Sequence, residues 1–132
     1  MPLIYAYTAE DAERDGELLH LSPATALEAG YGIRVLLTKG AYREAVEWTR
    51  GGGWQSEDAR FWDVLSVIRA AAKAALANER AYETKVYRVP NYTRSGAVSR
   101  AESATPQHLV VRAEGYNLTG EPCIIVALPG EN

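Results

Sequence analysis

The residues able to do metal or acid–base chemistry are few and scattered along the chain. The 132 residues include two histidines and one cysteine. His20 and His108 lie far apart in sequence, and no His-Glu-x-x-His or similar spacing supplies the several ligands that a zinc ion needs. We therefore expect structural or surface roles for both histidines, and the sequence predicts no metal and no cofactor.

The remaining reactive side chains also lack a catalytic arrangement. Cys123 lies inside the last apolar run, so we expect a small buried hydrophobe rather than a reactive thiol, and it has no partner for an intramolecular disulfide. Four carboxylates cluster near the N-terminus: Glu10, Asp11, Glu13 and Asp15. General acid–base catalysis needs carboxylates whose pKa is shifted in a cleft, whereas these are expected to begin a short helix and face water. With no nucleophile motif beside them, the sequence predicts no enzyme.

Tyrosine and arginine are the side chains best suited to binding. The chain has eight tyrosines, and one of them falls in the segment from Pro90 to Gln107, which has little hydrophobic periodicity and is predicted to be a long exposed loop. Tyrosine and arginine are frequent hot-spot residues at protein interfaces. The predicted binding residues are Tyr92, Arg94 and Arg100. They could also stack on nucleic-acid bases, but a net charge of −3 favours a protein partner over nucleic acid.

Composition places the chain among ordinary globular proteins, with 47% hydrophobic and 23% charged residues. No apolar run approaches the roughly 20 residues that span a bilayer, and the first residues lack the positive start and apolar stretch of a signal peptide. The run Gly51–Gly53 is not followed by the Lys-Ser/Thr pair of a phosphate-binding loop. We expect a single cytoplasmic domain over residues 1–132, with no membrane partner.

Helix start signals predict that short helices alternate with short strands in the first third of the chain. Thr8, Ser22 and Thr38 are typical N-cap residues, and each is followed by a short helical pattern. The third of these helices is predicted to end near Thr49. The short strands expected around these helices are 3–7, 18–21 and 33–37.

A long helix is predicted from Glu57 to Asn78, begun by Ser56, because its apolar residues recur every three or four positions. The aromatic pair Phe61-Trp62 is interpreted as core. Three strands are expected after this helix, at 82–89, 108–113 and 123–128. They are joined by loops without helices, which implies antiparallel pairing, and the last is apolar on both faces, as in the interior of a sheet. The predicted fold is α+β: short α/β steps, one long central helix and a C-terminal antiparallel β meander.

Four stretches, taken in order, carry a family resemblance: "IYAYTAEDAERDGELLHLS", "ALEAGYGIRVLLTKGAY", "RFWDVLSVIRAAAKAA" and "GEPCIIVALPGEN". They resemble a small uncharacterised domain family found in bacteria, their plasmids and their phages. The chain departs from that family's pattern at Cys123 and in its Asn-Leu-Thr turn. The resemblance implies a mobile-element context and a cytoplasmic location, and it carries over no activity and no catalytic residue.

Three functional hypotheses follow. The first is a non-enzymatic binding protein of a mobile genetic element that inhibits or modulates a host protein, for example a defence system such as CRISPR. The second is a small-ligand-binding or enzymatic domain whose site is assembled in three dimensions from His20, His108 or the acidic first helix. The third is a homodimeric structural protein whose final strand lies at the subunit interface.

Overall fold

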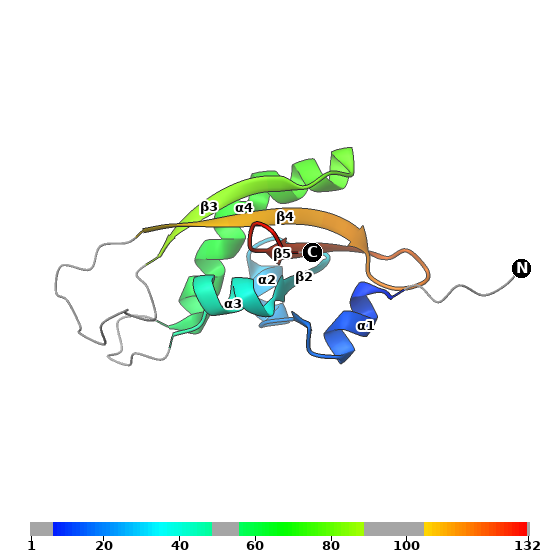
Figure 1. Ribbon diagram of the computed structural model, residues 1–132, viewed down its shortest axis with the longest axis horizontal. Helices are drawn as coiled ribbons and strands as arrows, with labels where there is room; N and C mark the ends of the chain where they lie inside the picture. Colours follow the sequence, from blue (N-terminus) through cyan, green and yellow to red (C-terminus); the bar gives the residue numbers. More distant parts are fainter. Residues whose placement is uncertain (1–6, 49–55, 89–104, 132) are drawn as a thin grey trace, which may run out of the picture.

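The computed structural model describes residues 7–48, 56–88 and 105–131. Its helices are α1 (Ala9–Arg14), α2 (Pro23–Glu28), α3 (Lys39–Ala45) and α4 (Glu57–Asn78). Its strands are β1 (Leu18–Leu19), β2 (Arg34–Thr38), β3 (Tyr82–Arg88), β4 (Thr105–Gly115) and β5 (Pro122–Ala127). Figure 1 shows these elements along the chain. The predicted α+β fold, with its single long helix, is confirmed.

The five strands form one mixed sheet in the order β1-β2-β5-β4-β3. β3, β4 and β5 pair antiparallel in sequence order, as the predicted C-terminal meander requires. β5 also pairs with β2 in parallel, with Val35 opposite Ile124 and Leu37 opposite Val126. The last strand of the chain is therefore the central strand of the sheet, and it has a strand neighbour on each side.

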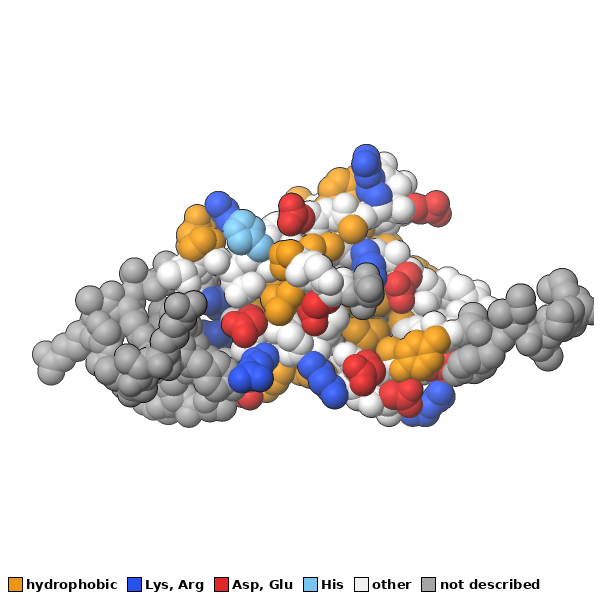
Figure 2. All heavy atoms as spheres, viewed as in Figure 1, with side chains coloured by type: hydrophobic (Ala, Val, Ile, Leu, Met, Phe, Trp, Pro, Cys, Tyr) orange, Lys and Arg blue, Asp and Glu red, His pale blue; other side chains and the backbone are white. Residues whose placement is uncertain are grey.

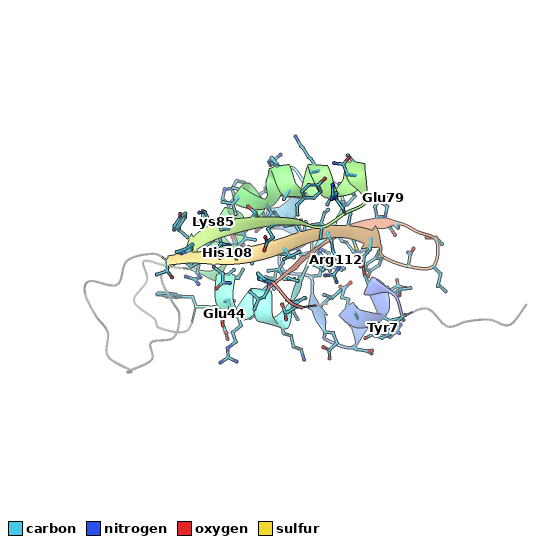
Figure 3. The ribbon with its side chains drawn as sticks, turned by 45° about the horizontal axis from the view of Figure 1, so that its top comes forward. Tyr7, Glu44, Glu79, Lys85, His108 and Arg112 are labelled. Carbon is cyan, nitrogen blue, oxygen red and sulfur yellow. The ribbon has the colours of Figure 1, made fainter. Side chains whose placement is uncertain are left out.

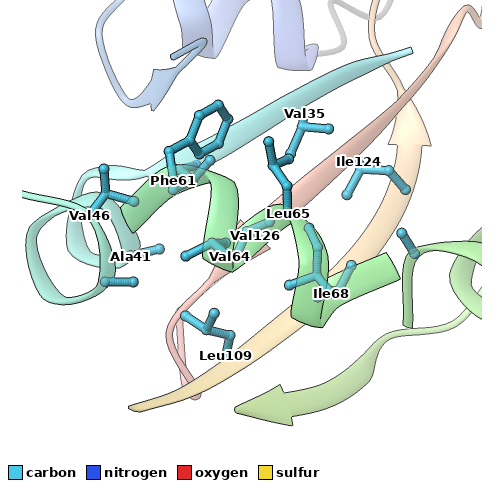
Figure 4. Close-up of a cluster of buried hydrophobic side chains, with 14 of the residues drawn as sticks. Val35, Ala41, Val46, Phe61, Val64, Leu65, Ile68, Leu109, Ile124 and Val126 are labelled. Carbon is cyan, nitrogen blue, oxygen red and sulfur yellow. The ribbon is translucent and has the colours of Figure 1, made fainter. Parts of the chain in front are cut away.

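The larger core lies between the sheet and α4, with α2 and α3 beside the long helix. Side chains that alternate along β2, β5 and β4 point to this side, and they meet Phe61, Leu65 and Ile68 of α4 (Figure 4). A smaller cluster covers the other face where α1 lies against it, and it contains Ala9, Ala12, Leu18, Leu36, Tyr116, Cys123 and Ile125. α1 is only six residues long, so it covers part of that face, and in the described ranges no other helix lies over β3 and most of β4 on this side (Figure 1).

Side-chain caps fix where the helices begin. Thr8 and Asp11 form the capping box at the start of α1, in which each side chain accepts a hydrogen bond from the other residue's backbone N–H. Ser22, Thr38 and Ser56 each accept a hydrogen bond from the backbone N–H three residues on. These predicted helix starts are confirmed. A cap depends only on residues close in sequence, so it can be recognised without knowing the tertiary packing.

Several predicted boundaries are wrong. β4 begins at Thr105, so the predicted loop ends earlier than Gln107; Pro106 is tolerated because it lies near the start of the strand. The strand predicted at 18–21 is reduced to two residues, and the third helix ends at Ala45 rather than Thr49. Of the strand expected at 3–7, residues 3–6 lie outside the described part of the chain, and Tyr7 is in no strand.

The aromatic pair on α4 is divided between core and surface. Phe61 is buried, as predicted, but Trp62 is 41% exposed. Consecutive residues point about 100° apart on a helix, so neighbours at the edge of an apolar stripe do not share its face. The prediction that both residues belong to the core is wrong for Trp62. None of the helices within the described ranges has the length and apolar character needed to cross a bilayer.

This division predicts different costs for two adjacent substitutions. We expect Phe61→Ala to lower the free energy of unfolding by about 3–5 kcal/mol, because it leaves a cavity in the main core. Trp62→Ala, the matched control on the same helix, should cost less than about 1 kcal/mol. Urea unfolding followed by circular dichroism measures both values, and equal costs would contradict the assignment of these two faces.

Candidate functional site

The binding residues predicted from the sequence, Tyr92, Arg94 and Arg100, lie outside the described residues. The structure does define where their segment joins the fold. Arg88, at the end of β3, is directly opposite Thr105, at the start of β4. The segment 89–104 therefore leaves and rejoins the sheet at the same end of the β3–β4 pair.

The uncovered side of β3 and β4 is the candidate binding surface, which we call the open face. It carries Glu83, Lys85 and Tyr87 from β3 and Pro106, His108, Val110 and Arg112 from β4. Cross-strand neighbours on it are Glu83 with Val110, Lys85 with His108, and Tyr87 with Pro106. Tyr87 is 55% exposed and lies near the end of the edge strand β3.

Charges of both signs are interspersed on the open face. The Lys85 ammonium lies 5.5 Å from the centroid of the Tyr87 ring, and the Arg112 guanidinium donates to Glu114 over 3.3 Å. Figure 2 views this side of the molecule, where acidic, basic and hydrophobic side chains alternate. In Figure 3, Lys85 and His108 lie together near the end where residues 89–104 attach, and Arg112 lies further toward α1. Such a mixed surface suits a protein better than a nucleic-acid backbone, which needs concentrated positive charge.

Behind the open face, two buried arginines connect α4 to β3 and to the end of α3. Arg88 Nη2 donates to the backbone carbonyl of Arg60 over 2.7 Å, and its Nη1 donates to the Asp63 carboxylate over 3.2 Å. Arg60 is 1% exposed, and its Nε donates to the carbonyl of Val46 over 3.0 Å. Burial, together with the nearby charge of Arg88, lowers the pKa of Arg60 to about 10. The two Arg88 bonds fix the position of the end of β3 on the long helix.

The sequence holds two signals for this buried arginine pair, which is absent from the predicted core. Arg60 lies four residues before Val64 on the apolar stripe of α4, and Arg88 shares a strand face with Val86. The hydrophobic periodicity of α4 and of β3 assigns both positions to the buried face, and both residues are buried. Because charged residues are normally exposed, we did not assign either to the interior.

The histidines and the acidic first helix do not assemble into one site. His20 Nδ1 lies 3.8 Å from a Glu13 oxygen beside α1, whereas His108 lies on β4 opposite Lys85. Glu13 also accepts a hydrogen bond of 2.6 Å from the Tyr116 hydroxyl, which raises the pKa of Tyr116 to about 12. Among the described residues, no group of three or more His, Cys, Asp and Glu side chains could hold a metal ion.

Two more acidic residues, one in α1 and one directly after it, have structural partners. Asp11 forms an ion pair with Arg14 and caps the helix, and Asp15 accepts a hydrogen bond of 2.7 Å from the Tyr7 hydroxyl. A hollow of about 350 Å³ lies between α1, the start of α3 and β4. Its lining includes the charged side chains of Glu17, Lys39, Arg112, Glu114 and Glu131. Thr38 also lines the hollow, and its hydroxyl donates to Glu131 over 2.7 Å.

Taken together, the fold and the surface describe a small α+β protein with an open sheet face and an exposed edge strand. No family model, no curated protein and no solved structure matches the chain. We therefore infer function from the site itself rather than from relatives.

Cys123 is buried on β5, as predicted, and burial raises the pKa of its thiol to about 11. Since only the accessible thiolate reacts, we expect Ellman's reagent at mildly alkaline pH to modify the native protein on the order of a hundredfold more slowly than the unfolded chain. The chain has only this cysteine, so the reaction reports on β5 alone. Equal rates with and without denaturant would contradict the burial of this strand.

Proposed function

We propose that the chain is a non-enzymatic binding protein of a mobile genetic element, acting in the cytoplasm to inhibit or modulate a host protein. A defence system such as CRISPR is the example of a target that the sequence resemblance suggests. The observation that carries the binding role is the open face, where no helix among the described residues covers β3 and most of β4. The rest of the sheet is closely packed on both sides.

The composition of the open face supports a protein partner. Tyr87 supplies a large, rigid contact area next to Lys85 and His108, and aromatic side chains of this kind are enriched in protein interfaces. The charges of Glu83 and Lys85 could set the orientation of a partner without attracting polyanions. Tyr92, Arg94 and Arg100 belong to the segment that joins this end of the two strands, so we propose that they contribute to the same surface.

The absence of enzymatic activity also remains a proposal. It is supported by the use of acidic side chains in the fold: Asp11 caps α1, Asp15 bonds Tyr7, and Glu13 bonds Tyr116. Carboxylates engaged in this way support the structure and are not positioned around a reacting group in a cleft.

Affinity capture from host lysate at physiological salt tests the proposal. The immobilised wild-type protein should retain a defined host protein, and the affinity for that protein should fall by about tenfold or more in Tyr87→Ser, because aromatic side chains at interface centres dominate binding energy. Tyr92→Ser examines the neighbouring segment in the same assay.

Leu118→Ser is the matched control, because Leu118 is 83% exposed in the turn between β4 and β5, away from the open face. It should bind as the wild type does. A wild-type protein that retains nothing, or a retained protein whose affinity is unchanged by Tyr87→Ser and Tyr92→Ser, would refute binding through the open face.

A further inference from the structure

β3 is the unpaired edge of the sheet. It is seven residues long and pairs with β4 on one side, and no described strand lies on its other side. The opposite edge, β1, has only two residues. A long edge with free backbone N–H and C=O groups can accept another strand unless something prevents it.

The charges on β3 oppose most partners but suit a second copy of the same strand. Glu83 and Lys85 flank Thr84, and both project from the open face. When two such strands pair antiparallel about a two-fold axis through Thr84, Glu83 of each copy lies directly opposite Lys85 of the other. Opposite charges in cross-strand positions stabilise a pair of strands, and like charges destabilise it. Within the described residues, neither Glu83 nor Lys85 has a salt bridge in its own chain.

The other face of the same register is also compatible with pairing. There, Tyr82 of one copy is opposite Val86 of the other, and both are at least partly buried against α4. Aromatic and β-branched residues form favourable cross-strand pairs. A shift by one residue, to an axis at Lys85, would instead oppose the two lysines.

The flank of α4 next to β3 would meet its counterpart across the same axis. Asp63 and Asn78 mark this flank because they bond Arg88 and Tyr82 of β3, and helical spacing places Val67, Ala71 and Ala74 between them. Val67 is 39% exposed, and Ala71 and Ala74 are half-buried. Figure 1 shows α4 crossing obliquely behind β3, with its C-terminal end beyond the strand. Small residues would let two antiparallel helices approach closely.

We propose that the protein is a homodimer in which the two β3 strands pair antiparallel about Thr84, so that one sheet continues through both chains. The structure differs here from the third sequence-based hypothesis, because β5 has strand neighbours on both sides and cannot supply the interface edge. The dimer would place two open faces side by side on one surface. It does not depend on the host-protein role proposed above.

Charge exchange on β3 tests the proposal through the dimer dissociation constant, measured by sedimentation equilibrium. The wild type should pass from 14.4 kDa to twice that mass with rising concentration. Glu83→Lys and Lys85→Glu should each raise the dissociation constant by about tenfold or more, because each opposes like charges twice across the axis. The double variant restores opposite pairs and should return to within about threefold of the wild type.

The two single variants change the net charge in opposite directions, so a general charge effect cannot weaken both. Glu17→Lys is the control, since Glu17 is exposed beside β1 at the other end of the sheet, and it should leave dimerisation unchanged. Circular dichroism confirms that each variant is folded. A wild type that is monomeric at all concentrations overturns the proposal, as does a double variant no better than the singles. If no host protein is captured, the masses measured by sedimentation equilibrium are unaffected. Each of the two proposals can therefore be refuted without refuting the other.

Discussion

The burial of β5 on both faces and along both edges is the constraint on which the rest of the structure depends. Every residue from Cys123 to Ala127 is fully buried. Apolar side chains on both faces require a layer above and a layer below the strand, and its backbone groups require a neighbour on each side. α4 and α1 supply the layers, while β2 and β4 supply the neighbours.

This arrangement also explains where the surface is left free. The layer beneath β5 is the short helix α1, which is anchored by the hydrogen bond of 2.7 Å from the Glu10 N–H to the Tyr116 carbonyl. Because α1 is short, it covers only the half of the sheet near β1 and β2. β3 is placed at the far edge, beyond that helix. Arg88 connects this edge to α4 through hydrogen bonds to Arg60 and Asp63, so the open face rests on a firmly packed support. Recognition surfaces on rigid elements lose less entropy when they bind.

The features that sequence reasoning predicted correctly are those with a local signal. The N-caps Thr8, Ser22 and Ser56 and the periodicity of α4 need only a few neighbouring residues to be recognised. The apolar run of β5 was enough to predict an interior strand. By contrast, the parallel pairing of β2 with β5 joins segments far apart in the chain, and no local pattern specifies it.

The errors in the sequence-based predictions also arise where a local pattern does not determine the structure. The start of β4 was placed too late because Pro106 resembles a loop residue, although a proline is tolerated near the start of a strand. Arg60 and Arg88 were not assigned to the interior because their charge outweighed their position in the pattern. The open face could not be foreseen either, since which half of a sheet remains uncovered depends on where a short helix packs. The binding residues predicted in 89–104 remain predictions.

Native-state hydrogen exchange of the β5 backbone amides tests the central role of this strand most directly. If β5 is the strand around which the fold is organised, its slowest amides should exchange only through global unfolding. Their protection free energy should then equal the free energy of unfolding from denaturant titration, while Leu18 and Leu19 of β1 exchange through smaller local openings. Exchange of all β5 amides through openings well below the global free energy, or no more slowly than those of β1, would contradict this account.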